Sequence, residues 1–291
     1  MIKSIENEFL IVEINETGAE LFSLKSKKTG IEYLWQANPE YWNGHAPVLF
    51  PICGRLFQGK YVYQGKEYEM PIHGIAKHAE FYSDKISDDE IIFTLTSDED
   101  TKKQYPFDFE FQLKYKLNGN ALETTYRVKN NGDKIMPFSF GAHPAFNVPF
   151  KSNERFEDYY IEFAKVVFDK ILFSKNGLYA GATKKCYLSD NKLELKHNIF
   201  DEDIFFVTEN NAVRLKSKVS DNFLEIAFND MTCLGVWQVP QTDAPFVCIE
   251  PWHGIPADEG KIDDLSTKRQ TIKLQPNKTY DNTYVIKISE N

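Results

Sequence analysis

The middle of the chain alternates hydrophobic and polar residues with the period of a β-strand. Between residues 107 and 117 every second position is Phe, Leu or Tyr, and the positions between them are Asp, Glu, Gln or Lys. Successive side chains of a strand point to opposite faces, so this pattern predicts a strand with one buried face. Two apolar runs, Leu122 to Lys129 and Ile135 to Phe140, flank an Asn-Gly pair within residues 130–133. They predict a hairpin, because Asn-Gly supplies the φ > 0 positions of a tight turn.

Short apolar, aromatic or β-branched runs separated by turn residues predict strands along most of the remaining chain. These are Phe9 to Ile14, Glu32 to Trp35, Glu90 to Thr96, Tyr159 to Phe163, Leu193 to Lys196, Ile204 to Val207, Ala212 to Leu215, Phe223 to Phe228, Cys233 to Val239, Phe246 to Glu250, Thr271 to Leu274 and Thr283 to Ile288. Asn38-Pro39 resembles a helix N-cap followed by Pro at the first helical position and predicts one or two turns. We expect residues 149–158 to form a long loop.

This distribution favours an all-β fold of antiparallel strands with few short helices. An α/β design would need long helices between parallel strands, and no long amphipathic helix is apparent. Hydrophobic residues make up 42% and aromatic residues 14% of the 291 positions, which is enough apolar material for a large core and an aromatic groove. No repeat or Gly/Ser-rich linker divides the sequence, so we expect a single domain over residues 1–291.

Charge and cysteine usage narrow the class of protein. The net charge of -9 disfavours a nucleic-acid partner, whose phosphates are bound mainly by Lys and Arg. The four cysteines lack CxxC spacing, which favours free thiols in a reducing compartment. With no apolar signal core and no apolar run of about 18 residues, we expect a cytoplasmic protein without a membrane partner. The sequence does not indicate an oligomeric state.

Three distant signatures combine histidine or glutamate with Gly or Pro. They are Met70-Pro71-Ile72-His73-Gly74, Gly141-Ala142-His143-Pro144-Ala145-Phe146-Asn147 and Cys248-Ile249-Glu250-Pro251-Trp252-His253-Gly254. Gly and Pro let the backbone leave a strand and hold a side chain at a rim. Histidine and glutamate are the usual proton carriers near neutral pH, and three of the six histidines fall in these signatures. The pattern predicts one active site assembled from three loops.

Each candidate residue also has a simpler interpretation. Glu250 ends an apolar run, so partial burial would raise its pKa and make it a better base, but a solvated strand-end glutamate fits equally well. His73 and His143 are either proton carriers or structural groups, and His78 and His253 remain uncertain neighbours. Metal binding by these histidines and Glu250 is disfavoured, because the sequence has neither an HExxH helix nor a two-cysteine knuckle. A serine or cysteine nucleophile is also disfavoured, since no Gly-x-Ser-x-Gly elbow occurs.

Four segments resemble the aldose 1-epimerase (galactose mutarotase) family, particularly its LacX-like branch. The segments are Pro51-Ile52-Cys53-Gly54-Arg55-Leu56, Ile72-His73-Gly74, Ala142-His143-Pro144-Ala145-Phe146-Asn147 and Cys248-Ile249-Glu250-Pro251-Trp252. They span nearly the whole chain in order. The resemblance implies a galactose mutarotase-like β-supersandwich, which agrees with the strand-rich pattern.

The resemblance also implies roles for individual residues. Glu250 matches the family's general base, His143 its general acid, His73 a second histidine that touches the sugar, and Arg55 a substrate-binding arginine. Ala142 stands where better-known members carry Asn, so a hydrogen bond made by that Asn is not expected here, and we expect the sugar preference to differ accordingly.

Two further contacts to substrate are expected. The family has a substrate-binding aspartate ahead of an apolar strand, for which Asp203 is the best candidate and Asp201 the fallback. Trp252 is expected to offer its ring to an apolar sugar face.

The implied reaction is the interconversion of α and β anomers of a free hexose such as galactose or glucose. It needs one base and one acid, and neither cofactor nor metal. A hexose-6-phosphate mutarotase remains an alternative, although only five of the 34 basic residues are arginine. A non-catalytic carbohydrate-binding or sensor protein on the same fold is a second alternative. A glycosidase is less favoured, because it needs two positioned carboxyl groups and only Glu250 lies in such a motif.

Overall fold

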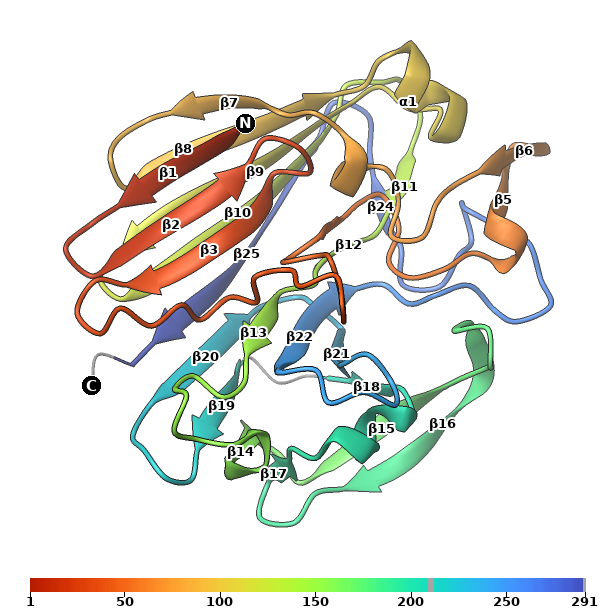
Figure 1. Ribbon diagram of the computed structural model, residues 1–291. Coiled ribbons are helices and arrows are strands. Elements are labelled where there is room, and N and C mark those ends of the chain that lie inside the picture. The colour runs from red at the N-terminus through yellow and green to blue at the C-terminus, as the bar shows by residue number, and fades with distance from the viewer. Residues whose placement is uncertain (209–211, 290–291) are drawn as a thin grey trace.

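The computed structural model describes residues 1–208 and 212–289, which form two large antiparallel β-sheets and three small sheets (Figure 1). The nine-stranded sheet has the order β17 (Lys192–Glu194), β14 (Tyr159–Phe163), β19 (Ala212–Ser217), β20 (Phe223–Phe228), β25 (Thr279–Ile288), β10 (Ala121–Asn130), β9 (Phe109–Asn118), β8 (Glu90–Thr96) and β7 (Tyr82–Lys85). The second large sheet has the order β16 (Tyr179–Tyr187), β15 (Val167–Phe173), β18 (Ile204–Val207), β21 (Cys233–Trp237), β22 (Phe246–His253), β12 (Phe140–Ala142) and β4 (Val48–Leu49), and β13 (Ala145–Asn147) also pairs with β22. The expected all-β architecture is confirmed.

The remaining elements are short. The small sheets are formed by β1 (Ile2–Glu6), β2 (Leu10–Asn15) and β3 (Glu20–Ser26), by β11 (Met136–Phe138) and β24 (Ile272–Leu274), and by β23 (Asp263–Asp264), β5 (Lys60–Tyr63) and β6 (Lys66–Glu69). The helices are α1 (Glu99–Gln104) and the 3₁₀ turns Phe57–Gly59, Ala76–His78, Phe156–Asp158 and His197–Asp201. None of the helices in the described residues is long and apolar enough to cross a membrane.

The alternating segment in the middle of the chain is β9, and its apolar side chains face the core as predicted. Phe109, Phe111, Leu113, Tyr115 and Leu117 are each at most 3% exposed, while the polar residues between them are partly exposed. Burial of one such side chain contributes about 1.5–3 kcal/mol relative to leaving it in water. The alternation therefore specifies which face of β9 is buried.

The predicted hairpin across residues 130–133 is wrong. The tight turn instead joins β9 to β10 through Gly119, which has φ +57°. The strand β10 is flanked by β9 on one side and β25 on the other, so it has no free edge for the following segment. That segment contains β11, which pairs with β24. The side-chain amide of Asn130 bonds Lys134 O and Leu274 O and thereby directs the chain away.

One other predicted strand is absent, whereas the expected short helix and long loop are present. Residues 32–35 form only isolated bridges, because side chains take the place of a strand partner. The Glu32 carboxylate accepts the Leu24 and Leu34 amides, and Asn147 Nδ2 donates to the Glu32 and Leu34 carbonyls. The expected helix after Asn38 is a single turn in which the Tyr41 and Trp42 amides both donate to Asn38 O. The long loop at residues 149–158 is present and ends in the 3₁₀ turn Phe156–Asp158.

Several elements have no clear signal in the sequence. Most of β16 is exposed, so it lacks the alternation that marks a half-buried strand. The strands β1, β3, β5, β6, β7 and β15 were also not predicted. The short helix α1 begins at Glu99, and the carboxylate of the preceding Asp98 accepts the amides of Asp100 and Thr101 as an N-cap. Helices of this length depend on such local caps and leave little periodicity to detect.

Candidate active site

The strand β22 lies inside the second large sheet, between β21 and the β12 and β13 segments (Figure 1). Residues two apart on a strand share a face, so Cys248, Glu250 and Trp252 point to one side. His253 points to the other side, where it stacks on Phe140 and its Nδ1 lies 2.7 Å from Asp230 O. The strand alternation therefore separates His253 from the candidate acid and base.

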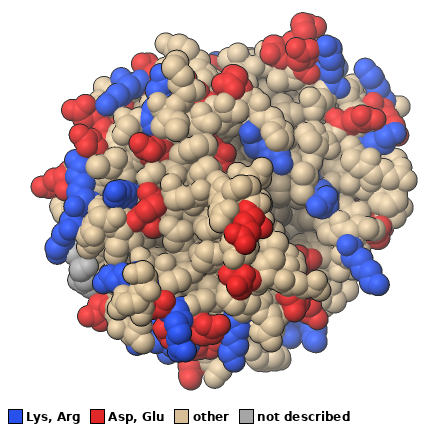
Figure 2. Space-filling view, in the orientation of Figure 1, with Lys and Arg blue, Asp and Glu red and all other residues tan. Residues whose placement is uncertain are grey.

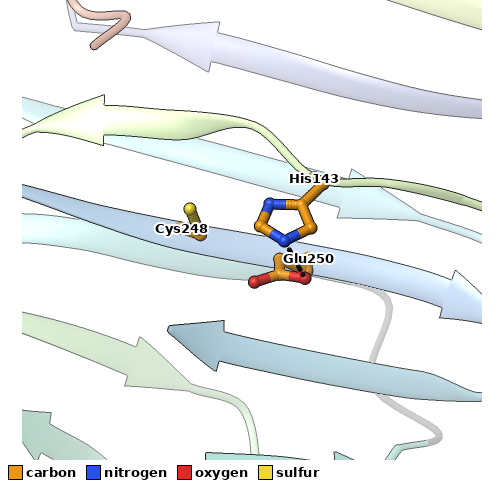
Figure 3. Close-up of side chains that lie close together, drawn as sticks. All are labelled: His143, Cys248 and Glu250. Carbon is orange, nitrogen blue, oxygen red and sulfur yellow. Dashed lines mark ion pairs between the residues drawn. The ribbon is translucent and has the colours of Figure 1, made fainter. Parts of the chain in front are cut away.

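His143 lies directly beside Glu250 because of strand register. Gly141 of β12 pairs with Trp252, and Ala145 of β13 pairs with Cys248, so the same register continued places His143 opposite Glu250. The His143 Nε2 and Glu250 Oε2 atoms are 3.2 Å apart (Figure 3). On the other flank, Gly235 pairs with Glu250 and leaves space for its side chain. A Cβ at Gly235 would lie 3.0 Å from the Phe205 ring and 3.3 Å from Glu250 Cβ.

Aromatic rings surround His143. Trp42 stacks on it with ring centroids 5.3 Å apart, and Trp237 and Trp252 approach at 5.8 and 6.5 Å. His143 is 9% exposed, and burial lowers its pKa from 6.5 to about 4. Glu250 is 3% exposed, and burial raises its pKa well above the ordinary value, with a smaller contribution from the negative charge of Asp203. Both shifts favour a pair that holds one proton between its two members.

Sequence reasoning missed Trp42 and Trp237. The chain has only four tryptophans, and three of them lie beside the imidazole of His143. The fourth, Trp35, donates its indole N–H to Trp42 O at 2.9 Å. The rarity of tryptophan was the available signal, but its positions have no spacing that connects them to His143.

His73 is held by two loops bonded to each other. Its backbone amide donates to Gly54 O, and its carbonyl accepts the Phe50 amide. Its Nδ1 accepts the Gly54 amide at 3.2 Å. Burial and the positive charges of His143, Lys77 and Arg55 lower the pKa of His73 well below 6.5. A neutral imidazole that accepts at Nδ1 carries its hydrogen on Nε2, so His73 is a donor there.

The backbone at His73 and Gly74 is unusual. His73 has φ +67° and Gly74 has φ +80°, both in the left-handed region. A Cβ at Gly74 would lie 2.2 Å from Phe50 O, so only glycine fits. The ring of His73 reaches the site through this turn, with its centroid 5.4 Å from both His143 and Trp252.

Arg55 and Asp203 are exposed residues whose charges act on buried groups of the site. The charge of Arg55 lowers the pKa of His73, and that of Asp203 raises the pKa of Glu250. Partial burial raises the pKa of Asp203, and the positive charges of Lys170 and Arg55 oppose this rise. Asp201 instead accepts the Gln241 amide at 3.1 Å. The structure therefore brings Asp203, and not the fallback Asp201, toward Arg55 and Glu250.

The expected aromatic platform, Trp252, is largely covered. It is 6% exposed and packs against Phe205 and His73, and its indole N–H donates to Ala142 O at 3.2 Å. The tryptophans with partly exposed surface beside His143 are Trp42 and Trp237. His78 is exposed at the end of the 3₁₀ turn Ala76–His78.

The second missed group is Lys77. It is half-buried, and burial and the charge of Arg55 lower its pKa. Its positive charge in turn contributes to the lowered pKa values of His73 and His143. Within residues 1–208 and 212–289, neither Lys77 nor Arg55 forms an ion pair. Two cations without an ion pair among these residues therefore lie near His73.

An open hollow of about 570 Å³ is lined by Arg55 and, from a second segment, by Lys175, Asn176 and Leu178. Gly177 in that segment approaches Arg55 closely, since a Cβ there would lie 3.3 Å from Nε. Neither Glu250 nor His143 lines this hollow, whereas the charge of Arg55, which does line it, contributes to the lowered pKa of His73. Figure 2 shows a hollowed area near the middle of the face in view, with both basic and acidic side chains around it.

Three side chains could also hold a metal ion. One donor atom from each of His143, Cys248 and Glu250 lies within 4.8 Å of the other two. The thiol and the carboxylate share one face of β22 and approach the imidazole (Figure 3). The sequence did not indicate this group, because a thiol two residues before a glutamate is not a recognised ligand spacing.

Comparison with known proteins extends these observations. A family model described as Aldose 1-epimerase matches residues 1–287. The plasmid-encoded protein LacX of Lactococcus lactis subsp. lactis is 35% identical over 301 residues, covering 99% of each chain. The X-ray structure of a galactose mutarotase related enzyme from Lactobacillus acidophilus superposes with a TM-score of 0.94 at 35% identity, covering 100% of this chain and 98% of the other. A galactose mutarotase-like protein from Lactobacillus casei ATCC 334 gives a TM-score of 0.93 at 29% identity, covering 99% and 100%. The resemblance inferred from the four segments is confirmed.

Proposed function

The chain belongs to the aldose 1-epimerase family, and from this membership and its buried acid-base pair we propose that it interconverts the α and β anomers of a free hexose such as galactose or glucose. Family membership and the mutarotase-like relatives support a sugar isomerase. The observation that carries the proposal is the 3.2 Å contact between His143 Nε2 and Glu250 Oε2.

In the proposed reaction Glu250 removes the proton of the C1 hydroxyl while His143 protonates the ring oxygen. The bond between C1 and the ring oxygen breaks and leaves an open-chain aldehyde. Rotation about the C1–C2 bond presents the other carbonyl face, and reclosure reverses the two proton transfers. The two reacting oxygens are bonded to the same carbon, so an acid and a base that lie side by side suit this reaction.

The raised pKa of Glu250 and the lowered pKa of His143 favour a protonated carboxyl beside a neutral imidazole. Transfer of that proton from Glu250 to His143 would form the carboxylate–imidazolium pair that acts as base and acid in the proposed reaction. A positioned acid or base typically contributes about 10²- to 10⁴-fold to the rate. His73 would donate its Nε2 hydrogen to a sugar hydroxyl, and Arg55 and Asp203 would bind hydroxyls at the rim.

Mutarotation can be measured directly by polarimetry, starting from pure α-D-galactose or α-D-glucose. We expect wild-type protein to accelerate the approach to equilibrium, and Glu250→Gln and His143→Ala to lose most of that acceleration. Glu154→Gln is the matched control, because Glu154 is also buried but lies in the 149–158 loop, where its carboxylate accepts a hydrogen bond from the Tyr159 hydroxyl. Spontaneous rates with wild-type protein for all common hexoses and pentoses would refute the proposal. Sugar binding without acceleration would favour the non-catalytic sensor.

A second candidate substrate is a hexose phosphate. Arg55 and Lys175 line the open hollow, Lys77 lies near the two histidines, and none of these three cations forms an ion pair within the described residues. A phosphate is well bound by unpaired basic groups of this kind. If it is the substrate, hexose 6-phosphates will be preferred over free hexoses, and Lys175→Met will lower kcat/KM for the phosphate only. Inorganic phosphate should then inhibit the wild-type protein.

A further inference from the structure

We infer that His143, Cys248 and Glu250 form a binding site for a thiophilic divalent cation such as Zn²⁺, and that this cation inhibits the protein by occupying its proton-transfer pair. The inhibition rests on the proposed function, whereas the binding site does not. The three residues supply an imidazole nitrogen, a sulfur and a carboxylate oxygen. These are the donor types by which proteins bind zinc.

The spacing of the donors fits a three-ligand site. The three atoms lie within 4.8 Å of one another. Zinc holds nitrogen and oxygen donors at about 2.0–2.2 Å and sulfur at about 2.3 Å, so the donors need to draw together by roughly 1 Å. Glu250 and Cys248 are anchored on one strand, and His143 lies opposite Glu250 in the adjoining segment (Figure 3). Small side-chain rotations therefore suffice, and the backbone can stay in place.

The two ring nitrogens of His143 differ in their surroundings. Nε2 lies 3.2 Å from Glu250 Oε2, so it is the nitrogen that can bind a cation together with this carboxylate. Nδ1 is buried and has no hydrogen-bond partner within the described residues, and it would carry the ring hydrogen when Nε2 binds the cation. A neutral imidazole is the commonest metal ligand in proteins.

The thiol of Cys248 has no part in the proposed sugar reaction. It is fully buried, and it is brought to the acid-base pair only by the alternation of β22. On binding, the sulfur, the carboxylate oxygen and the imidazole nitrogen form bonds to the cation, and the thiol proton and the proton held by the Glu250–His143 pair both leave to solvent, without any redox change. The cation then occupies lone pairs that Glu250 and His143 need for proton transfer. Bound sugar and bound cation should exclude one another.

Cobalt(II) tests the site without reference to activity. Full-length wild-type protein titrated with Co²⁺ should develop the near-ultraviolet thiolate-to-cobalt charge-transfer absorption, and Zn²⁺ should abolish it by displacement. Cys248→Ala should not develop it. Cys233→Ala is the matched control and should behave like wild type, because Cys233 is also a buried thiol but contacts Gln270.

Inhibition by Zn²⁺ is the second measurement. Loss of an outer-shell partner already weakens metal binding by about 10- to 100-fold, so Cys248→Ala should raise the inhibitory Zn²⁺ concentration at least that much. Absence of the cobalt absorption in folded wild-type protein overturns the site, even if mutarotation is active. Equal inhibition of wild type and Cys248→Ala also overturns it. A cobalt absorption that depends on Cys248 supports the site even if no mutarotation is found.

Discussion

Replacement of Glu250 by glutamine should stabilise the fold while removing its proposed activity. Glu250 is 3% exposed, and burial raises its carboxyl pKa well above 4.5. A group whose pKa is raised on folding stabilises the folded state fully below its unfolded pKa. That stabilisation is lost as the pH rises through the folded pKa. Glutamine has nearly the same shape as protonated glutamate and cannot ionise, so the variant keeps this stabilisation at every pH.

The magnitude follows from the linkage between proton binding and stability. The free energy of unfolding of Glu250→Gln relative to wild type should be constant below about pH 4.5 and rise above it. Each pH unit between 4.5 and the folded pKa adds about 1.4 kcal/mol to this difference. His143 has the opposite dependence, because its pKa is lowered to about 4, but it is present in both proteins.

Urea unfolding followed by tryptophan fluorescence, at intervals from about pH 4 to 8, measures this difference. Polarimetry on the same samples should show a loss of about 10²- to 10⁴-fold in rate, equivalent to roughly 3–5 kcal/mol in the activation barrier. A difference in stability that does not change with pH, or a variant less stable than wild type at the alkaline end, would refute the reasoning. Either result would mean that the carboxylate is ionised and well compensated in the folded protein.

Three further changes test the site and its supports. The value of kcat/KM should have a bell-shaped pH dependence. It should fall on the acid side near pH 4, where His143 is protonated in addition to Glu250, and on the alkaline side, where the pair loses its one proton. An acid-side fall centred near pH 6.5 would contradict the burial of His143. Trp42→Ala should admit water to His143 and raise its pKa from about 4 toward 6.5 in an NMR titration, with a smaller change for Trp42→Phe, which keeps a ring in place. Gly74→Ala should destabilise the fold by more than the ~1–3 kcal/mol of a strained backbone alone, since the added Cβ would lie 2.2 Å from Phe50 O. Gly65→Ala is the control in thermal unfolding, because Gly65 has a similar φ of +76° and an added Cβ there would meet nothing within 4 Å.

Local patterns in the sequence determined part of the strands and most of the candidate side chains. The boundaries of β8, β14, β18 and β20 are those predicted, because their alternating or fully apolar runs end at turn residues. The Gly- and Pro-containing signatures also identified His73, His143 and Glu250, which the fold does bring together. Such signals are local, since a turn or a buried face depends on a few neighbouring residues.

Strand pairing, burial and electrostatic environment were decided only by the tertiary structure. The segment after Asn130 could not pair with β10, because β9 and β25 occupy both of its edges. The register of β12 and β13 against β22 set His143 opposite Glu250, while strand alternation turned His253 away. The pKa of a proton carrier depends on the groups packed around it. For His143 those groups include the rings of Trp42 and Trp237, which lie far from it in sequence and meet it only in the folded chain.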